Sequence, residues 1–243
     1  TDKLITTEDP VEYEIDGIVQ CQINHEIDLT FAAALRSILR QDPDVILVGE
    51  IRDQETAEMA FRAAMTGHQV FATLHTNSAL AAVQRLRDIG VSPEILAGNM
   101  IGVIGQRLAR KLCGQCKVPA QLTPNDQKLL NVAAADVSNT RIYKAVGCEY
   151  CGQSGYRGRF VLMEVLLFDE KMDELIATNA SPPELARYAR SNGFLTLRDD
   201  AIRRVLDLAR LQRLAARKGQ ELGRDLGTAR CCIVDELGNR REL

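Results

Sequence analysis

Apolar and polar residues alternate in blocks along the first hundred positions, so that short apolar runs are separated by helical patterns. The run VILV at 45–48 is apolar at every position, which is typical of a strand buried on both faces of a parallel sheet. Apolar residues at 31, 35, 38 and 39 form one stripe of a helix that Thr30 would cap. The pattern predicts an α/β fold with a mostly parallel sheet. The expected strands are 4–7, 45–48 and 68–75, and the expected helices are 30–39, 55–65, 79–89 and one that begins at 93.

The character of the sequence changes after residue 112, where Gly, Pro, Asn and Gln become more frequent. The elements expected there are a helix at 125–135, a strand at 160–167 and helices that begin at 170, 182 and 197, the last reaching about 218. The expected segments are a core at 1–112, a cysteine subdomain at 113–155, a mainly helical region at 156–224 and a loose tail at 225–243.

Charge and composition exclude several classes of partner. The 30 Lys and Arg residues against 33 Asp and Glu give a net charge of −3, so no global basic field attracts nucleic acid or an anionic membrane. Residues 203–224 hold seven Lys or Arg and two Asp or Glu, which we interpret as a solvated helical face. Aromatic residues make up only 5% and no apolar run approaches the ~20 residues of a membrane span. We expect no nucleic-acid partner and no membrane span.

Four of the seven cysteines form two CxxC pairs with 31 residues between them, namely Cys113 with Cys116 and Cys148 with Cys151. Four thiolates complete the tetrahedral shell of Zn²⁺ and leave no position for water, so this spacing favours a structural zinc site. The alternative is four unrelated buried thiols. The other three cysteines show no such spacing and are interpreted as incidental, namely Cys21, Cys231 and Cys232.

Polar residues follow three of the expected strands at the point where each strand ends. These segments are EDPVE at 8–12, GEIRD at 49–53 and HTN at 75–77. The carboxyl ends of parallel strands form the ligand crevice of an open sheet. Carboxylates, an arginine and a histidine gathered there can orient water and a divalent metal against a phosphate chain. A single glutamate or histidine is more often a helix cap or a turn residue, but three such endings together favour a catalytic site.

Three segments resemble motifs of the secretion ATPase superfamily, which drives type II secretion and type IV pilus assembly. ITTEDPVEY at 5–13 resembles its aspartate box, LRQDPDVILVGEIRD at 39–53 its Walker B segment, and TGHQVFATLHTN at 66–77 its histidine box. GFLTLRDDA at 193–201 resembles its last recognisable block, so the resemblance covers about residues 4–206. It implies a RecA-like core with a tetracysteine zinc insert, which assembly ATPases carry, and a helical C-terminal region.

The resemblance implies roles for individual residues and the cofactors ATP, Mg²⁺ and Zn²⁺. Glu12 would polarise the attacking water, Glu50 would act through Mg²⁺ or its bound water, and His75 would contact the γ-phosphate. Arg36 and Arg40, four positions apart on one expected helix face, would neutralise phosphate charge, within their own subunit or across a subunit boundary. A solvated arginine pair fits their spacing equally well. The implied nucleotide-binding residues are Glu8, Arg36, Arg40, Arg52 and His68.

One motif of the family has no counterpart, because the sequence contains no G-x-x-x-x-G-K-[ST] phosphate loop. In the family this loop precedes the aspartate box. We therefore expect the sequence to be a fragment whose ATPase core begins upstream of Thr1. Without the amides and the lysine of that loop, we expect this chain by itself not to hydrolyse ATP.

The resemblance also implies an assembly and a location for the complete protein. It implies a homo-hexamer at the cytoplasmic face of the inner membrane, peripheral to it, with an inner-membrane platform protein and other secretion or pilus components as partners. The motifs do not distinguish secretion from pilus assembly or from a DNA-uptake motor of competence. The alternative from another class is a zinc-stabilised binding module without hydrolytic activity.

Overall fold

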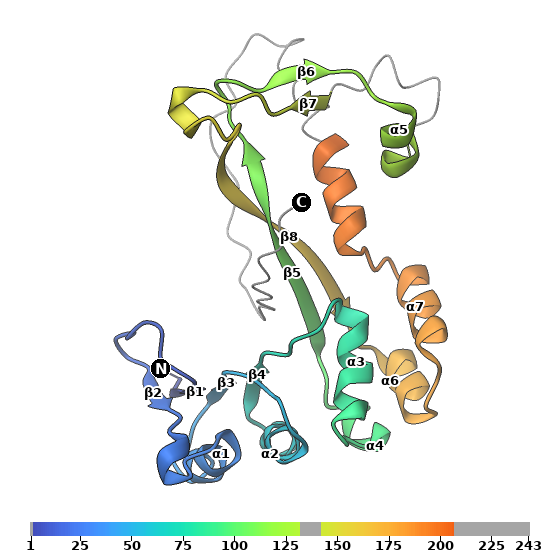
Figure 1. Cartoon of the computed structure of the whole chain (residues 1–243). Helices are drawn as coiled ribbons and strands as arrows, with labels where there is room; N and C mark the ends of the chain where they lie inside the picture. Colours follow the sequence, from blue (N-terminus) through green and yellow to red (C-terminus); the bar gives the residue numbers. More distant parts are fainter. Residues whose placement is uncertain (1, 132–141, 207–243) are drawn as a thin grey trace. The chain divides into compact units, whose positions relative to one another are not determined.

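The computed structural model describes residues 2–131 and 142–206 of the chain (Figure 1). These residues group into two compact units. The first contains the residues up to Gly105 together with Glu164–Phe194, and the second contains Gln106–Met163 and the described residues from Leu195 onward. The expected boundaries at 112 and 155 both fall inside the second unit, and the region expected at 156–224 is divided between the two.

The first unit is built on a parallel sheet of four strands, which confirms the expected fold class. The strands β1 (Leu4–Glu8), β2 (Val19–Gln22), β3 (Val45–Val48) and β4 (Gln69–Ala72) lie in the order β2-β1-β3-β4. All three pairings are parallel, with Thr6 opposite both Gln20 and Leu47. Ile46 and Val48 of the inner strand β3 are fully buried. The carboxyl ends of all four strands therefore meet at one edge of the sheet.

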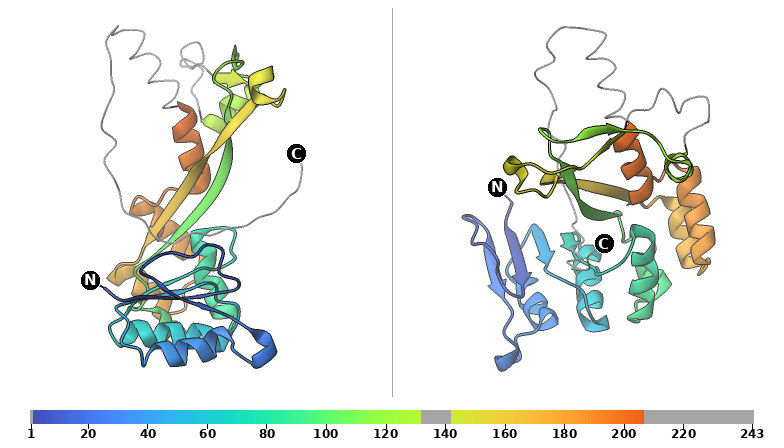
Figure 2. Two further views of the ribbon diagram at one scale, coloured as in Figure 1. Left: turned by 90° about the vertical axis from the view of Figure 1, so that its left-hand side faces the viewer. Right: turned by 45° about the horizontal axis from the view of Figure 1, so that its top comes forward.

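Helices α1 (Phe31–Ile38) and α2 (Gln54–Met65) lie together on one face of this sheet (Figure 1, Figure 2). The Oγ1 of Thr30 accepts the N–H of Ala33 at 3.2 Å, and the Asp53 carboxylate accepts the N–H of Thr56 at 2.8 Å. Such caps contribute about 1 kcal/mol each, because they satisfy an amide that the helix itself leaves free. The Asp53 cap fixes the start of α2 directly after the candidate site residues 50–52.

The described part of the first unit has four further helices, namely α3 (Ala79–Asp88), the single turn α4 (Pro93–Leu96), α6 (Glu170–Ala177) and α7 (Pro182–Ser191). The short 3-10 helix η1 (His25–Ile27) follows β2. Helix α3 packs on α7, and α4 packs on α6. The Arg87 guanidinium donates to the carbonyl oxygens of Ile176 at 3.1 Å and Ala180 at 3.3 Å. Residues almost a hundred positions apart in sequence thereby share one core.

The second unit contains mainly strands around the cysteines. Its elements are β6 (Val118–Ala120), α5 (Pro124–Leu130), β7 (Ile142–Lys144), the 3-10 helix η3 (Glu149–Cys151) and a helix at 197–206. Strands β6 and β7 pair in antiparallel fashion, with Pro119 opposite Tyr143. Two long strands, β5 (Gly102–Leu112) and β8 (Tyr156–Leu167), pair as a separate two-stranded sheet, and each has residues in both units. No described helix is both long and apolar enough to cross a membrane.

Several expected elements differ from the structure. The strand expected at 68–75 is shortened to Gln69–Ala72, although Thr73 still forms backbone hydrogen bonds with Val48 and Ile51. Strands β2, β5, β6 and β7 were not expected, and β8 begins at Tyr156 rather than at 160. The helix expected at 125–135 is Pro124–Leu130, and its remainder falls partly in 132–141, outside the described residues. Other expectations also concern residues outside the described part of the chain. These are most of the basic stretch at 203–224, the tail at 225–243, and Cys231 with Cys232.

Candidate functional site

The carboxyl edge of the parallel sheet is extended by hydrogen bonds beyond the strands themselves. The N–H of Gly49 donates to the carbonyl of Thr7 at 2.7 Å, and the N–H of Ile51 donates to Thr73 at 3.0 Å. A Cβ at residue 49 would lie 2.6 Å from the Thr7 carbonyl oxygen, so only glycine permits this close approach. The backbone thus holds the residue that follows Gly49 between the ends of its two neighbouring strands.

That residue is Glu50, whose side chain is almost buried and held on both carboxylate oxygens. His75, which follows β4, places Nε2 3.1 Å from Oε2. Arg52 places a guanidinium nitrogen 2.5 Å from Oε1. The Glu50 side chain is 10% exposed, whereas those of His75 and Arg52 are 51% and 63% exposed. The structure therefore brings three of the expected site residues together as one cluster, with the carboxylate at its base.

A second carboxylate, that of Asp9, also affects the charge of this cluster. The hydrogen bond that Arg52 donates to Glu50 raises the pKa of the Arg52 guanidinium above its ordinary value, against a smaller opposing effect of burial. The negative charges of Glu50 and Asp9 add to the rise in this pKa. Asp9, directly after β1, also lies 3.4 Å from Nε2 of His25. The charge of Arg52 is therefore stabilised by carboxylates that follow two different strands.

Glu8 forms a neighbouring arrangement on β1 and β2. Its Oε1 accepts the hydroxyl of Thr6 at 2.5 Å and the amide of Gln20 at 2.9 Å. Gln20 and His25 were not among the expected site residues. The run VQCQ lacks an apolar pattern, so β2 went unnoticed and with it the residues it positions. A signal was available two residues after the strand, where Asn24 caps η1.

Four other expected site residues lie apart from the Glu50 cluster. Glu12 is exposed, beyond the end of β1, and no hydrogen bond or ion pair joins it to the described residues of the cluster. His68 precedes β4, at the end opposite to His75, where its Nδ1 lies 3.0 Å from the Ala63 carbonyl. Arg36 forms an ion pair with Glu55. The expectation that Arg36 and Arg40 share a helix face is wrong, because α1 ends at Ile38 and Arg40 lies in the turn that follows.

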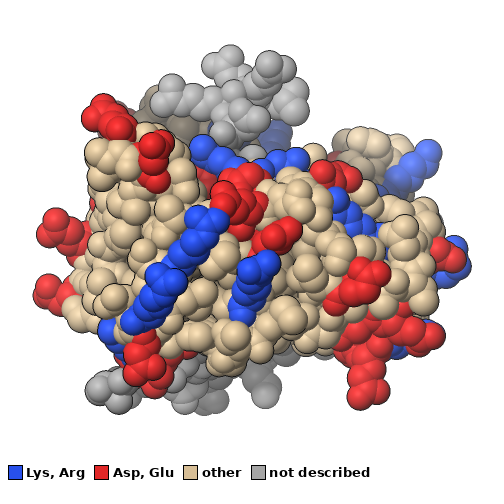
Figure 3. Space-filling model, turned by 90° about the horizontal axis from the view of Figure 1, so that it is seen from below, with Lys and Arg blue, Asp and Glu red and all other residues tan. Residues whose placement is uncertain are grey.

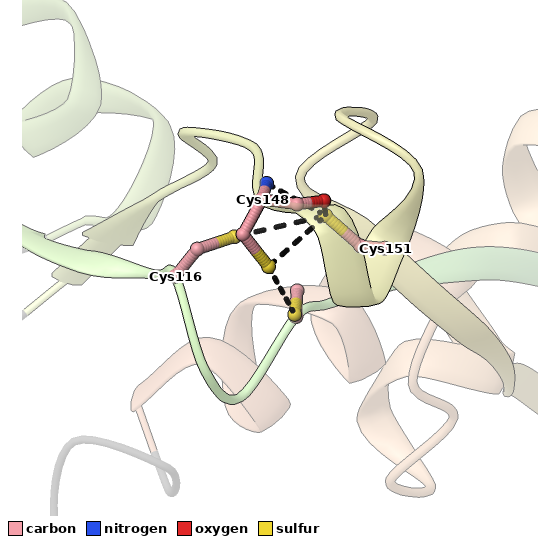
Figure 4. Close-up of side chains that lie close together, drawn as sticks. Cys116, Cys148 and Cys151 are labelled. Atoms are coloured by element: carbon pink, nitrogen blue, oxygen red, sulfur yellow. Dashed lines mark hydrogen bonds between the residues drawn. The ribbon is translucent and has the colours of Figure 1, made fainter.

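The four paired cysteines of the second unit converge on one point. All four sulfur atoms lie within 4.8 Å of one another, and they form the only such group of potential metal ligands among the described residues. The Sγ–Sγ distances are 3.9 Å for Cys113 and Cys148, 3.8 Å for Cys116 and Cys151, and 3.7 Å for Cys148 and Cys151 (Figure 4). A tetrahedron with Zn–S bonds of ~2.3 Å has edges of about 3.8 Å. The cluster therefore has the dimensions of a four-thiolate metal site.

Backbone amides point at these sulfur atoms, as expected where thiolates carry negative charge. Sγ of Cys151 accepts the N–H groups of Cys148 and Gly155, each at 3.2 Å, and Sγ of Cys116 accepts the N–H of Gly147 at 3.4 Å. Desolvation opposes ionisation of Cys151, but the two amides together with the sulfur atoms of Cys148 and Cys116 outweigh it and lower the pKa of Cys151 to about 6. Desolvation raises the pKa of Cys116 to about 11. Cys21 is a free thiol in β2, outside the cluster.

Charges on the molecular face shown in Figure 3 are mixed. Lysine and arginine side chains are interspersed with aspartate and glutamate among uncharged residues, without a single extended basic area on that face. Mixed charges of this kind favour solubility over the electrostatic attraction of a polyanion.

Known proteins with similar sequences are secretion and pilus proteins. Residues 1–215 match the family described as Type II/IV secretion system protein. The chain is 47% identical over 213 residues to the type IV pilus assembly ATPase PilB of Thermus thermophilus, covering 87% of this chain and 24% of that protein. It is 48% identical over 207 residues to the type II secretion system protein E of Pseudomonas aeruginosa, covering 85% of this chain and 41% of that protein.

A solved structure agrees with the sequence matches. The crystal structure of the pilus retraction motor PilT with bound ADP aligns with a TM-score of 0.52 and 30% identity, over 82% of this chain and 52% of that one. The chain thus spans less than half of the length of the two curated relatives. On the match of the family model and these identities, the chain belongs to the Type II/IV secretion system protein family.

Proposed function

We propose that the complete protein hydrolyses ATP and uses the energy to drive type II secretion or type IV pilus assembly. One observation carries this proposal, namely the almost buried Glu50 carboxylate, held between His75 and Arg52 at the carboxyl edge of a parallel sheet. The relatives named as ATPases support the reaction class. The sequence lacks a G-x-x-x-x-G-K-[ST] motif, so in this proposal the phosphate loop comes from outside these 243 residues.

In this proposal the residues of the cluster have distinct tasks. Glu50 offers carboxylate oxygens to Mg²⁺ or to water bound by it, the hard-ligand chemistry that this ion prefers. Arg52 neutralises charge beside it, and His75 is exposed enough to reach a phosphate. Glu12 is exposed and free to approach a water molecule at the nucleotide, and Glu8 orders the neighbouring strand end. Mg²⁺, when bound, would supply charge neutralisation to the phosphates.

The experiment is ATP hydrolysis by the complete protein in the presence of Mg²⁺. Glu50→Gln keeps the volume of the side chain but removes its charge, and we expect turnover to fall by about 10²-fold or more, with nucleotide binding retained. Glu12→Gln should have a similar effect if Glu12 orients the attacking water. The matched control is Glu14→Gln, because Glu14 is a neighbouring exposed glutamate. Turnover at the wild-type rate in Glu50→Gln would refute the assignment of this cluster.

We also propose that the cysteine cluster holds a structural Zn²⁺. The four sulfur atoms fit the tetrahedral geometry of this ion, and their amide hydrogen bonds would stabilise its thiolate ligands. A complete four-thiolate shell leaves no position for a substrate. Zinc would therefore stabilise the fold of this segment rather than take part in catalysis. Elemental analysis should find one Zn²⁺ per chain.

We further propose that the complete protein is a homo-hexamer at the cytoplasmic face of the inner membrane, where it acts on a platform protein. Ring assembly would allow a residue of one subunit to complete the nucleotide site of the next. Arg36 and Arg40 are the candidates for this role, since both are exposed. The ion pair of Arg36 with the exposed Glu55 would have to open for such a contact.

A further inference from the structure

Glu164 is a buried acidic residue outside every motif recognised in the sequence. It lies in β8, within the first unit, and only 3% of its surface is exposed. Its neighbours in the strand, Met163 and Val165, are exposed. Acidic side chains are almost never buried to this degree without a specific partner. A carboxylate at this position therefore has a task that an apolar residue would not perform.

The partner that the structure places against it is the first turn of α3. Oε1 of Glu164 accepts the N–H of Ala79 at 2.5 Å, in a buried contact between residues 85 positions apart. Ala79 is the first residue of α3 and has no exposed surface. The amides of a first turn have no partner within their own helix, and they carry the positive end of its dipole. A carboxylate is the side chain that matches both properties.

The anchored turn is the end of the loop that carries His75. Three residues, 76–78, connect His75 to Ala79. The first of them, Thr76, is buried and its hydroxyl donates to the carbonyl of Ser78 at 3.0 Å. The loop is therefore fixed at one end by the Glu164 contact and at the other by β4. His75, whose ring lies against Glu50, is thus part of a segment that is attached on both sides.

A glycine on β5 makes room for this carboxylate. A Cβ at Gly105 would lie 2.9 Å from both Cγ and Oε1 of Glu164, closer than Cβ contacts in proteins allow. The φ angle of Gly105 is not in the left-handed region, so its backbone conformation would admit other residues. Space for the Glu164 side chain, rather than backbone freedom, is what this glycine provides.

We infer that Glu164 is a positioning residue for the nucleotide site, acting through α3 and the loop 76–78 on His75. This inference rests on the proposed function for its catalytic readout, but the contact itself can be tested without it. Loss of the carboxylate frees the start of α3 and lets His75 leave Glu50. We expect substrate affinity to change little, because Glu164 contacts the start of α3.

The first experiment measures hydrogen exchange of the amides of 76–81 in the complete protein. Glu164→Ala should raise the exchange rate of the Ala79 amide at least tenfold, whereas Glu164→Gln retains an acceptor oxygen and should keep the rate within about threefold. The matched control is the exposed Glu170, as Glu170→Ala, which should leave these rates unchanged. Unchanged protection in Glu164→Ala would overturn the inference, whatever the protein hydrolyses.

The second experiment measures kcat and KM for ATP in a double-mutant cycle. We expect Glu164→Ala and Gly105→Ala each to lower kcat about tenfold or more with KM within threefold, and Glu164→Gln to restore most of kcat. Gly105→Ala should add no further loss in the Glu164→Ala background, because it acts only by displacing that carboxylate. Additive losses, or equal losses in Glu164→Ala and Glu164→Gln, would overturn the inference. ATP hydrolysis that is insensitive to Glu50→Gln would instead refute the proposed site.

Discussion

Nε2 of His75 lies 3.1 Å from Oε2 of Glu50, although the two residues are 25 positions apart and follow different strands. The parallel pairing of β3 with β4 brings their carboxyl ends together, and the hydrogen bond from Ile51 to Thr73 keeps them in register beyond the strands. The imidazole is thus held by a carboxylate that is itself almost buried, whereas its own ring remains accessible. This pairing leads to the first prediction.

His75→Ala should reduce ATP turnover by the complete protein by about tenfold to a hundredfold, because the proposed contact of His75 with a phosphate would be lost. His68→Ala should have an effect smaller than threefold, since His68 lies at the other end of β4. Steady-state kinetics of the two variants side by side would check this. Equal losses of turnover in the two variants would contradict this prediction and would support a role for His68 at the nucleotide.

Cys151→Ser should release the proposed metal and make the segment 113–155 sensitive to protease, because the metal contributes folding free energy where little apolar core exists. Cys21→Ser provides the control, as its thiol lies in β2 outside the cluster. Zinc content and limited proteolysis, read together, test the prediction. A segment that stays protease-resistant after complete loss of zinc would contradict it.

Asp169 should make stability depend on pH in the acidic range. Its carboxylate accepts the N–H of Met172 at 2.8 Å, the hydroxyl of Tyr188 at 2.8 Å and the amide of Asn192 at 2.9 Å, linking the cap of α6 to α7. The Met172 amide and the Tyr188 hydroxyl are the main groups that hold the pKa of Asp169 below its ordinary value.

A depressed pKa in the folded state means that the stabilisation is present above the unfolded-state pKa of about 4 and is lost as the pH falls below it. Asp169→Asn cannot ionise and should show a flatter decline of unfolding free energy between about pH 5 and 3. Urea denaturation at each pH measures this decline, with Asp88→Asn as the control. A decline as steep as that of the wild type would exclude Asp169 as its source.

Arg36→Ala or Arg40→Ala subunits mixed with Glu50→Gln subunits should regain part of the ATPase activity if either arginine acts across a subunit boundary. Some interfaces in such a ring would carry both intact residues. Activity measured at several mixing ratios should exceed that of both parents. Activity no higher than the parents at every ratio would assign the arginines to their own subunit.

The sequence predicted the parts of the fold in which local pattern and packing agree. Strand β3 was found because each of its residues is apolar, and α2 because Asp53 caps an amphipathic helix. Strand β5 was missed, since its two glycines and its basic residues interrupt any apolar alternation. Arg40 was placed on α1 because helical spacing alone does not show where the helix ends.

Some contacts of the candidate site could likewise be predicted from the sequence, and others could not. The meeting of Glu50 with His75 follows from the rule that parallel strands end at one edge, so it could be expected from sequence. The four cysteines were likewise found by their spacing. The contact of Glu164 with Ala79 could not be expected, because nothing local distinguishes a buried glutamate in a strand from an exposed one. Contacts of this kind are fixed only by the tertiary fold.

The same contact has a consequence for the order of events during synthesis. The ribosome completes β1 to β4, and with them Glu50 and His75, long before it reaches β8. Until Glu164 emerges, the first turn of α3 lacks its carboxylate and the loop behind His75 is anchored at one end only. A nascent chain can therefore form the parallel sheet early, while the proposed nucleotide site still lacks this support. Among the described strands β8 is the last to be made, and it carries the carboxylate that fixes the start of α3.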